Sequence, residues 1–159
     1  MGSSSFKRSL GLTREHCMIR TVYLNGEYFP ENEAKISIFD RGFLMADAVY
    51  EVTSVLDGKL IDFKGHADRL NRSLDELDMK NPIPYEELLS IHRELVRLND
   101  IDEGLGLSSN LARSSIRQRF RIPNPDETNP TIVLFTQNKP GLANSPSAKV
   151  GLKIISINE

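Results

Sequence analysis

The chain is poor in cysteine, tryptophan, histidine and long apolar runs. Its 159 residues contain one cysteine, no tryptophan and three histidines. The lone Cys17 cannot form an internal disulfide, which favours a reducing compartment, and nothing around it indicates an activated thiolate. No stretch approaches the roughly 20 apolar residues of a membrane helix. We therefore expect a cytoplasmic protein with no membrane partner.

The chain also lacks a charge excess and a metal-binding pattern. The formal net charge is −2 and the isoelectric point is about 6.0, so no basic domain predicts nucleic-acid binding. His92 lies beside the apolar face of a predicted helix and has no second histidine or cysteine at metal-ligand spacing. We expect a satisfied surface histidine there, and no metal site.

Residues 1–17 differ in composition from the rest of the chain. They are rich in Ser, Lys and Arg and show no periodicity. They are expected to be a disordered or non-native extension, with a short transit-like segment as the alternative. Met18 stands immediately before a strand pattern and is a candidate natural start.

The first regular pattern is that of antiparallel strands. β-Forming residues flank Asn25-Gly26 over 22–29, and a second such pair flanks Asp57-Gly58 over 49–63, which predicts two hairpins. Residues 35–39 alternate as well and predict a strand or extended segment. Asp-Arg-Gly at 40–42 predicts a turn.

The period then changes to that of an α-helix. Apolar residues spaced by three and four predict one helix over 63–77 and a second over 84–99. Arg69 stands at the edge of the first apolar face, near its N-terminal end. Two interpretations stay open: a snorkelling surface side chain, or a phosphate ligand, since a guanidinium near a helix N-terminus suits that anion.

The C-terminal third is less regular. Residues 131–136 are typical of a buried strand, whereas 106–115 have poor strand propensity and leave that strand without a hairpin partner. Residues 138–148 have linker composition, and 149–159 open with a strand pattern. We expect an α+β fold: a two-layer domain of antiparallel strands with two helices packed on one side, over 18–137, plus the first strand of a truncated second domain.

Four motifs stand in a characteristic order. They are Tyr-Leu-Asn-Gly-Glu at 23–27, Phe-Asp-Arg-Gly-Phe at 39–43, Asp-Ala-Val-Tyr-Glu-Val at 47–52 and His-Ala-Asp-Arg-Leu-Asn-Arg-Ser at 66–73. Together they resemble the N-terminal domain of the class IV aminotransferases, a family of fold-type IV pyridoxal phosphate enzymes. Asp-Arg-Gly-Phe with Val-Tyr-Glu-Val is most similar to the D-amino-acid transaminase branch of that family.

The resemblance implies a cofactor, substrates and a partner. The cofactor is pyridoxal 5'-phosphate, the substrates are amino acids of the D-amino-acid or branched-chain type with their 2-oxo acids, and the partner is a second copy in a homodimer. Arg69 resembles the arginine that holds the cofactor phosphate. Tyr50 resembles the tyrosine on the substrate side of the pocket. Phe39 and Arg41 resemble the loop that supports this pocket and the dimer contact, and they are counted with the substrate-binding residues.

The chain departs from the family pattern in places that bear on activity. Met-Ala-Asp-Ala at 45–48 replaces a more common Phe-Gly-Asp-Gly, which is tolerable only where those positions do not need positive φ. In the family's order the Schiff-base lysine follows residue 159, and Lys149 and Lys153 precede its motif. The chain alone is therefore expected to hold no catalytic residue and to be inactive.

The stretch 106–115 leaves its own question open. The family runs a strand resembling Val-Tyr-Leu-Gln-Ile-Ser-Arg-Gly-Ala there, and one set of codons for this chain gives that series when read one base later. A compensated frameshift and a true divergence are both open, and sequencing the gene separates them.

Two other functions compete with aminotransfer. An aminodeoxychorismate lyase-type enzyme would share the cofactor pocket. A catalytically inactive fragment would act at most as a binding or assembly module. The local basic cluster Arg113, Arg117, Arg119 and Arg121 has only Phe120 as an interleaved aromatic, which argues against nucleic acid as its partner.

Overall fold

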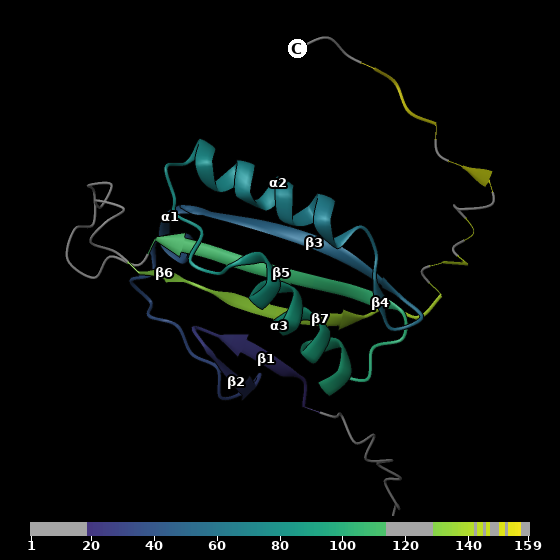
Figure 1. The fold of residues 1–159 in the computed structure, drawn as a ribbon, viewed down its shortest axis with the longest axis horizontal. Helices are drawn as coiled ribbons and strands as arrows, with labels where there is room; N and C mark the ends of the chain where they lie inside the picture. Colours follow the sequence, from purple (N-terminus) through teal and green to yellow (C-terminus); the bar gives the residue numbers. More distant parts are fainter. Residues whose placement is uncertain are drawn as a thin grey trace, which may run out of the picture.

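In the computed structural model, an antiparallel sheet carries two long helices on one face (Figure 1). The structure describes residues 19–113, 129–141, 143–144, 146, 150–151 and 153–156. The elements in chain order are β1 (Thr21–Leu24), β2 (Glu27–Pro30), α1 (Arg41–Met45), β3 (Ala48–Leu56), β4 (Lys59–Leu60), α2 (Phe63–Glu76), α3 (Tyr85–Leu98), β5 (Gly104–Arg113), β6 (Pro130–Thr131) and β7 (Val133–Asn138). This arrangement confirms the predicted two-layer α+β fold.

The sheet is not ordered as the chain is. Its strands lie in the order β2-β1-β7-β5-β3-β4, β6 also pairs with β5, and each of these pairings is antiparallel. Strand β5 holds the centre, because Gly106 is opposite Thr53 of β3 on one side and Thr136 of β7 on the other. The expectation that β7 lacks a hairpin partner is therefore wrong. Two rows of backbone hydrogen bonds outweigh the weak strand propensity of β5.

The turn dipeptides form the predicted hairpins. Asn25 and Gly26 have φ of 50° and 107°, and Asp57 and Gly58 have φ of 49° and 66°. Positive φ at both central residues matches the twist of the flanking strands. The return strand of the second hairpin, β4, has only two residues and is shorter than predicted. Residues 35–39 form no strand.

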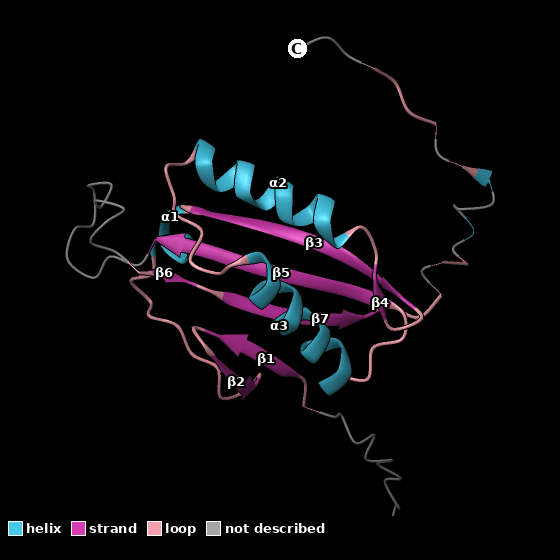
Figure 2. Ribbon diagram, viewed as in Figure 1, coloured by secondary structure: helices cyan, strands magenta, loops and turns pink. Residues whose placement is uncertain are grey.

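Both helices bury the apolar faces that their sequence periods predict. Figure 2 shows α2 along β3, and α3 crossing the middle of the sheet toward β1. Leu70 and Leu74 of α2 and Leu95 of α3 are almost fully buried, in one cluster with Leu134 of β7. Burying such side chains stabilises a fold by about 1.5–3 kcal/mol each, so this cluster fixes α2 against β3.

His92 corrects one expectation, because it is buried rather than on the surface. Its Nδ1 lies 2.7 Å from the Leu88 carbonyl oxygen, and since a carbonyl only accepts, Nδ1 carries the proton. Its ring meets Phe63 edge to face, with ring centroids 4.9 Å apart. No described residue contacts Nε2 by a hydrogen bond, and the same holds for the buried Thr53 hydroxyl. Burial lowers the pKa of His92 to about 4.

The domain boundaries stay predictions. The expected extension at 1–17 lies outside the described residues. Strand β7 ends at Asn138, where the expected linker 138–148 begins. Of the expected strand over 149–159, the described residues 150–151 and 153–156 carry no strand, and the others lie outside the described part of the chain.

Candidate functional site

Strand β3 distributes its side chains onto two faces. Val49, Glu51 and Thr53 are buried on the face that α2 covers, whereas Tyr50 is 73% exposed. Successive strand residues point to opposite faces, so Tyr50 lies on the face away from α2. Among the described strands, only the short β4 borders the outer edge of β3, at its last two residues. Tyr50 is therefore open to solvent beside an uncovered strand edge.

A buried carboxylate joins β3 to α2. Glu51 is 3% exposed, and its Oε1 accepts hydrogen bonds from the backbone N–H of Val52 at 3.0 Å and from His66 Nδ1 at 2.8 Å. Arg69 donates from Nε to Oε2 at 2.6 Å and from Nη2 to Oε1. Because a carboxylate acceptor needs a donor, the proton of a neutral His66 lies on Nδ1. Two α2 side chains are thus held by one residue of β3.

The electrostatics of this cluster favour its charged form. Burial raises the pKa of Glu51, but the hydrogen bonds from Arg69, His66 and Val52 outweigh burial and leave that pKa below its usual value. In turn, the Glu51 carboxylate raises the pKa of Arg69 through its hydrogen bonds and its charge.

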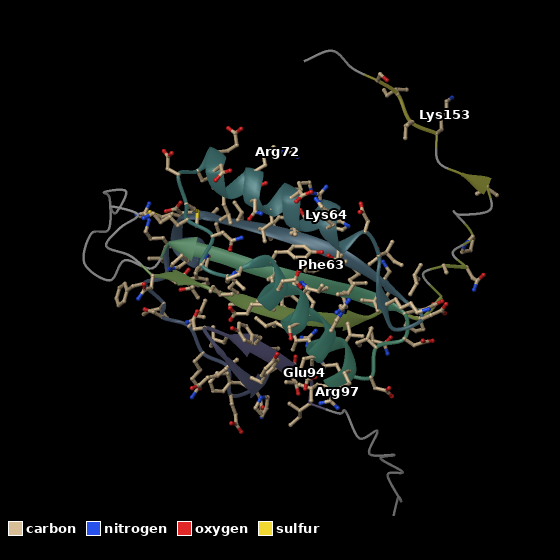
Figure 3. All side chains as sticks on the ribbon, in the orientation of Figure 1. Phe63, Lys64, Arg72, Glu94, Arg97 and Lys153 are labelled. Atoms are coloured by element: carbon tan, nitrogen blue, oxygen red, sulfur yellow. The ribbon has the colours of Figure 1, made fainter. Side chains whose placement is uncertain are left out.

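Arg69 remains accessible despite this ion pair. Its side chain is 55% exposed, while that of Glu51 is 4% exposed. No described residue accepts a hydrogen bond from its Nη1. Figure 3 marks Lys64 and Arg72 on the same helix, where Lys64 pairs with Asp68 across one turn at 2.6 Å. Arg69 bonds to Glu51 of β3 on one edge of its guanidinium. The other edge of the guanidinium therefore presents a fixed positive charge to solvent.

The loop before β3 is organised by Asp40. The predicted turn at 40–42 is the start of the one-turn helix α1. Asp40 caps this helix, because its Oδ1 accepts hydrogen bonds from the N–H of Gly42 at 2.9 Å and the N–H of Phe43 at 3.2 Å. Its other oxygen accepts from the Thr131 hydroxyl at 2.7 Å. Such a cap contributes about 1 kcal/mol to a helix. Here it also ties α1 to β6.

Arg41 is placed inside this loop. It is 7% exposed, and its Nε donates to Asp47 Oδ2 at 2.6 Å. The contact closes the loop between α1 and β3. Phe39, in contrast, is about half exposed. A substrate contact by either residue stays a prediction, and the described role of Arg41 is to support the loop.

The chain also places an alanine in a glycine-like conformation. Ala46 follows α1 with φ 54° and ψ 24°, in the left-handed region. A Cβ there crowds the following carbonyl, at a cost of roughly 1–2 kcal/mol. Ala48, the other alanine of the 45–48 motif, lies in β3 and has no positive φ. The motif's two methyls are therefore not equivalent.

Exposed apolar side chains gather around α1. Six large ones between residues 36 and 45 are 40–69% exposed, and together we call them the α1 patch: Ile36, Ile38, Phe39, Phe43, Leu44 and Met45. Soluble monomers rarely expose large apolar patches, and a segment with this many exposed apolar side chains is a candidate interaction site.

Of the predicted site residues, the structure sets Arg69 on α2 against Glu51 of β3, leaves Tyr50 on the opposite face of β3 and keeps Arg41 within the loop. Glu51 and His66, which bond to each other beside Arg69, were not predicted. The alternation of β3 could have revealed Glu51, because it places this carboxylate on the buried face between Val49 and Thr53. A buried carboxylate requires a cation or hydrogen-bond donors as partners. Figure 3 places Lys153 on the C-terminal segment, away from the sheet. Lys149 lies outside the described residues.

Two further features concern the described residues only. Within 19–113 and the shorter described segments that follow, no helix is long and apolar enough to cross a membrane. The same residues contain no cluster of three or more His, Cys, Asp or Glu side chains suited to a metal ion.

Sequence comparison relates the chain to known aminotransferases. A family model described as amino-transferase class IV matches residues 48–158. The D-alanine aminotransferase of Staphylococcus haemolyticus is 35% identical over 117 residues, which are 74% of this chain and 41% of that protein. The chain thus spans about two fifths of the length of the curated relatives it matches.

Structure comparison gives the same fold. The branched-chain amino acid aminotransferase of T.th. with pyridoxamine 5'-phosphate has a TM-score of 0.63 at 20% identity, over 76% of this chain and 40% of that one. The Escherichia coli branched-chain amino acid aminotransferase has a TM-score of 0.65 at 15% identity, also over 76% of this chain and 40% of its own. At these identities the likeness concerns the fold.

Proposed function

The chain belongs to the class IV aminotransferase family, and from this membership we propose that it forms part of an enzyme that transfers amino groups between amino acids and 2-oxo acids. The cofactor of that reaction is pyridoxal 5'-phosphate. The chain contributes the phosphate-binding arginine and the substrate-side wall of the pocket. Residues 18–137 form this N-terminal domain, 138–148 the linker and 149–159 the start of the next domain.

The observation that carries the proposal is the state of Arg69. Its guanidinium is exposed on its outer edge and held by Glu51 on its inner edge. A planar guanidinium with free N–H groups binds a phosphate in two-point fashion. A cofactor that carries a phosphate therefore fits the residues present here.

Each proposed site residue then has a task. Arg69 holds the cofactor phosphate, and Tyr50, on the other face of β3, borders the substrate. Phe39 adds an apolar surface, while Arg41 keeps the loop in place through Asp47. When bound, pyridoxal phosphate supplies an electron sink for the charge that develops on the substrate carbon. In the family's order, the lysine that moves the proton would follow these residues.

The relatives favour D-amino acids as substrates. The match to D-alanine aminotransferases covers 74% of this chain at 35% identity, whereas a putative branched-chain-amino-acid aminotransferase matches at 38% identity over only 50% of this chain. We infer D-alanine as the first substrate to test and a branched-chain L-amino acid as the second. The single cysteine supports a reducing, cytoplasmic setting.

The α1 patch supports pairing with a second copy. Its exposed apolar side chains lie on the loop that precedes the proposed substrate wall. Burying them between two copies would remove apolar surface from water, the main favourable contribution to association. The homodimer is therefore proposed to form next to the site.

Ligand binding tests the role of Arg69 directly. Pyridoxamine 5'-phosphate is the probe, because it has no aldehyde to react with surface lysines, and pyridoxamine is the matched ligand without phosphate. Arg69→Ala removes a charge-assisted contact, so we expect roughly 10- to 100-fold weaker binding of the phosphate form. Arg72→Ala, on the same helix, is the control and is expected to bind as the parent chain does. Equal binding by all three chains contradicts the proposed site.

Transamination is tested in a chimera. The residues of the S. haemolyticus D-alanine aminotransferase that match this chain are replaced by those of this chain. With a 2-oxo acid such as 2-oxoglutarate added as the amino acceptor, we expect pyruvate to form from D-alanine faster than the corresponding 2-oxo acid forms from L-leucine. We also expect Arg69→Ala to weaken cofactor retention. A folded chimera that retains cofactor and releases neither product contradicts the aminotransferase proposal.

A further inference from the structure

Glu51 is a charged residue at a position where burial makes a charge unfavourable. It lies inside a β-strand, on the face packed against a helix, and 3% of it is exposed. A buried carboxylate without partners would be strongly unfavourable, so its hydrogen bonds decide whether the fold tolerates it. Here Val52, His66 and Arg69 all donate to it. An apolar residue would fill the same place more cheaply, so the carboxylate calls for a reason beyond packing.

The geometry of the pair with Arg69 supplies that reason. Glu51 accepts from Nε and Nη2, which are on one edge of the guanidinium plane. The opposite edge carries Nη1 and faces solvent, as the 55% exposure of the side chain indicates. An exposed arginine loses rotamer freedom when a ligand immobilises it. An arginine already held by a carboxylate has lost most of that freedom before the ligand arrives.

His66 completes the arrangement. Its Nδ1 donates to the same Glu51 oxygen that accepts from Arg69 Nη2, one turn earlier on α2. The imidazole and the guanidinium therefore converge on one oxygen of Glu51. The other ion pair on this helix, Lys64 with Asp68, lies at the surface, with side chains 76% and 61% exposed.

We propose that Glu51 is a positioning residue, whose buried carboxylate fixes the Arg69 guanidinium so that its outer edge receives a phosphate group. The inference rests on the proposed function, because it takes Arg69 as the phosphate ligand. It assigns Glu51 a role that acts through Arg69 and involves no contact with the ligand. The contrary role is that of a competitor, which would neutralise Arg69 and weaken anion binding.

The first measurement needs no ligand. In the full 159-residue chain labelled with ¹⁵N-arginine, the Nε–H of Arg69 should exchange slowly with water because Glu51 accepts it. Glu51→Gln should speed this exchange at least several-fold, whereas Asp68→Asn, one residue before Arg69, should leave it unchanged. Rapid exchange in the parent chain would show that the pair does not persist in solution and overturns the inference.

The second measurement is a double-mutant cycle of pyridoxamine 5'-phosphate binding. We expect Glu51→Gln to weaken binding by roughly 10-fold, about the worth of one hydrogen bond to a charged group. In an Arg69→Ala background the same change should have no further effect, because Glu51 acts only through Arg69. A carboxylate needed merely for folding would weaken binding equally in both backgrounds, and that result overturns the inference.

The outcomes separate this inference from the proposed function. If Arg69→Ala leaves binding unchanged, or the parent chain does not bind the probe, the proposed phosphate site fails and the inference fails with it. If Arg69→Ala weakens binding while Glu51→Gln leaves it unchanged or tightens it, only the positioning role fails. Should Glu51→Gln not fold, Glu51→Asp retains the charge but withdraws it by one methylene, and it is expected to weaken binding in the same background-dependent way.

Discussion

At position 46 an alanine holds a backbone conformation that suits glycine, with φ of 54° after the last turn of α1. Ala46→Gly should raise the free energy of unfolding by about 1 kcal/mol, because it removes the crowding of the Cβ in the left-handed region. Urea denaturation followed by circular dichroism measures the change.

The matched control is the second alanine of the same motif. Ala48→Gly, in β3, should lower the free energy of unfolding by about 0.5–1 kcal/mol, because glycine there only adds freedom to the unfolded chain. Changes of the same sign at positions 46 and 48 would contradict the backbone account.

A second residue, His92, couples stability to pH. Its pKa is about 4 in the folded chain because it is buried, against an ordinary value of 6.5. Above pH 6.5 His92 is neutral in both the folded and the unfolded chain, and burying it carries no ionisation cost. As the pH falls from 6.5 toward 4, the unfolded chain binds a proton that the folded chain does not, so the free energy of unfolding falls by up to roughly 3 kcal/mol.

Urea denaturation between pH 7 and pH 4.5 checks this dependence. His92→Leu removes the titrating ring and keeps an apolar side chain beside Phe63, so its stability should change less over that interval than that of the parent chain. Parallel curves for the two chains would show that His92 does not contribute. The comparison cancels the other titrating groups, which both chains share.

At the scale of elements, Asn99 joins the end of α3 to two strands. Its Oδ1 accepts from the Thr21 N–H at 2.7 Å, and its Nδ2 donates to the Thr21 carbonyl and to the Thr136 hydroxyl, each at 2.8 Å. Asn99→Ala leaves these partly buried groups without a partner, which should cost about 2–3 kcal/mol of unfolding free energy.

Chemical denaturation of Asn99→Ala and Asn71→Ala checks the assignment. Asn71 is exposed and accepts one hydrogen bond, from Asn81, so its substitution should cost less than about 0.5 kcal/mol. Asn99→Asp is informative as well, because it keeps the acceptor but loses both donors, and it should destabilise like the alanine. Equal effects at positions 71 and 99 would contradict the role of Asn99.

Local chemistry explains which elements could be predicted from the sequence. The turns at Asn25-Gly26 and Asp57-Gly58 depend on residues that accept positive φ, and α2 and α3 depend on a period visible within each segment. Strand β5 could not be found in this way, because its Gly and Ser residues disfavour strands and it forms through partners far along the chain. Residues 35–39 alternate like a strand but have no partner strand among the described elements.

In the candidate site, too, residues placed by local spacing could be predicted, whereas residues placed by packing between elements could not. Arg69 could be placed near the N-terminal end of a helix by spacing alone, and its phosphate role came from the surrounding motif. Its partner Glu51 is 18 residues away, and only the packing of α2 on β3 brings the two together. His92 was misplaced for a similar reason: the residue beside an apolar helix face is buried when a sheet, rather than solvent, covers that side.

At the scale of the whole molecule, the α1 patch predicts the oligomeric state. Phe43 is among the most exposed of its side chains, and Phe43→Glu places a charge where a second copy is expected to pack. We expect the parent chain to sediment as a dimer and the variant to shift toward monomer by at least 10-fold in dissociation constant.

Leu77→Glu is the control, since Leu77 is an exposed apolar residue at the C-terminal end of α2 and does not belong to the α1 patch. It should leave the dimer intact. Sedimentation velocity over a concentration series distinguishes the three chains. A monomeric parent chain, or equal effects at positions 43 and 77, would contradict pairing through the α1 patch.

The strand order has a consequence for the order of events during synthesis. The hairpin of β1 and β2 is made before the other described strands, yet among those strands β1 borders only β2 and β7, and β7 ends at Asn138. An isolated two-stranded hairpin is marginally stable in water. The first part of the domain to leave the ribosome must therefore wait for more than a hundred further residues before it can join the sheet. Such long-range closure slows folding and leaves strand edges unpaired in the meantime, so nascent chains that stop before β7 should be those most in need of a chaperone.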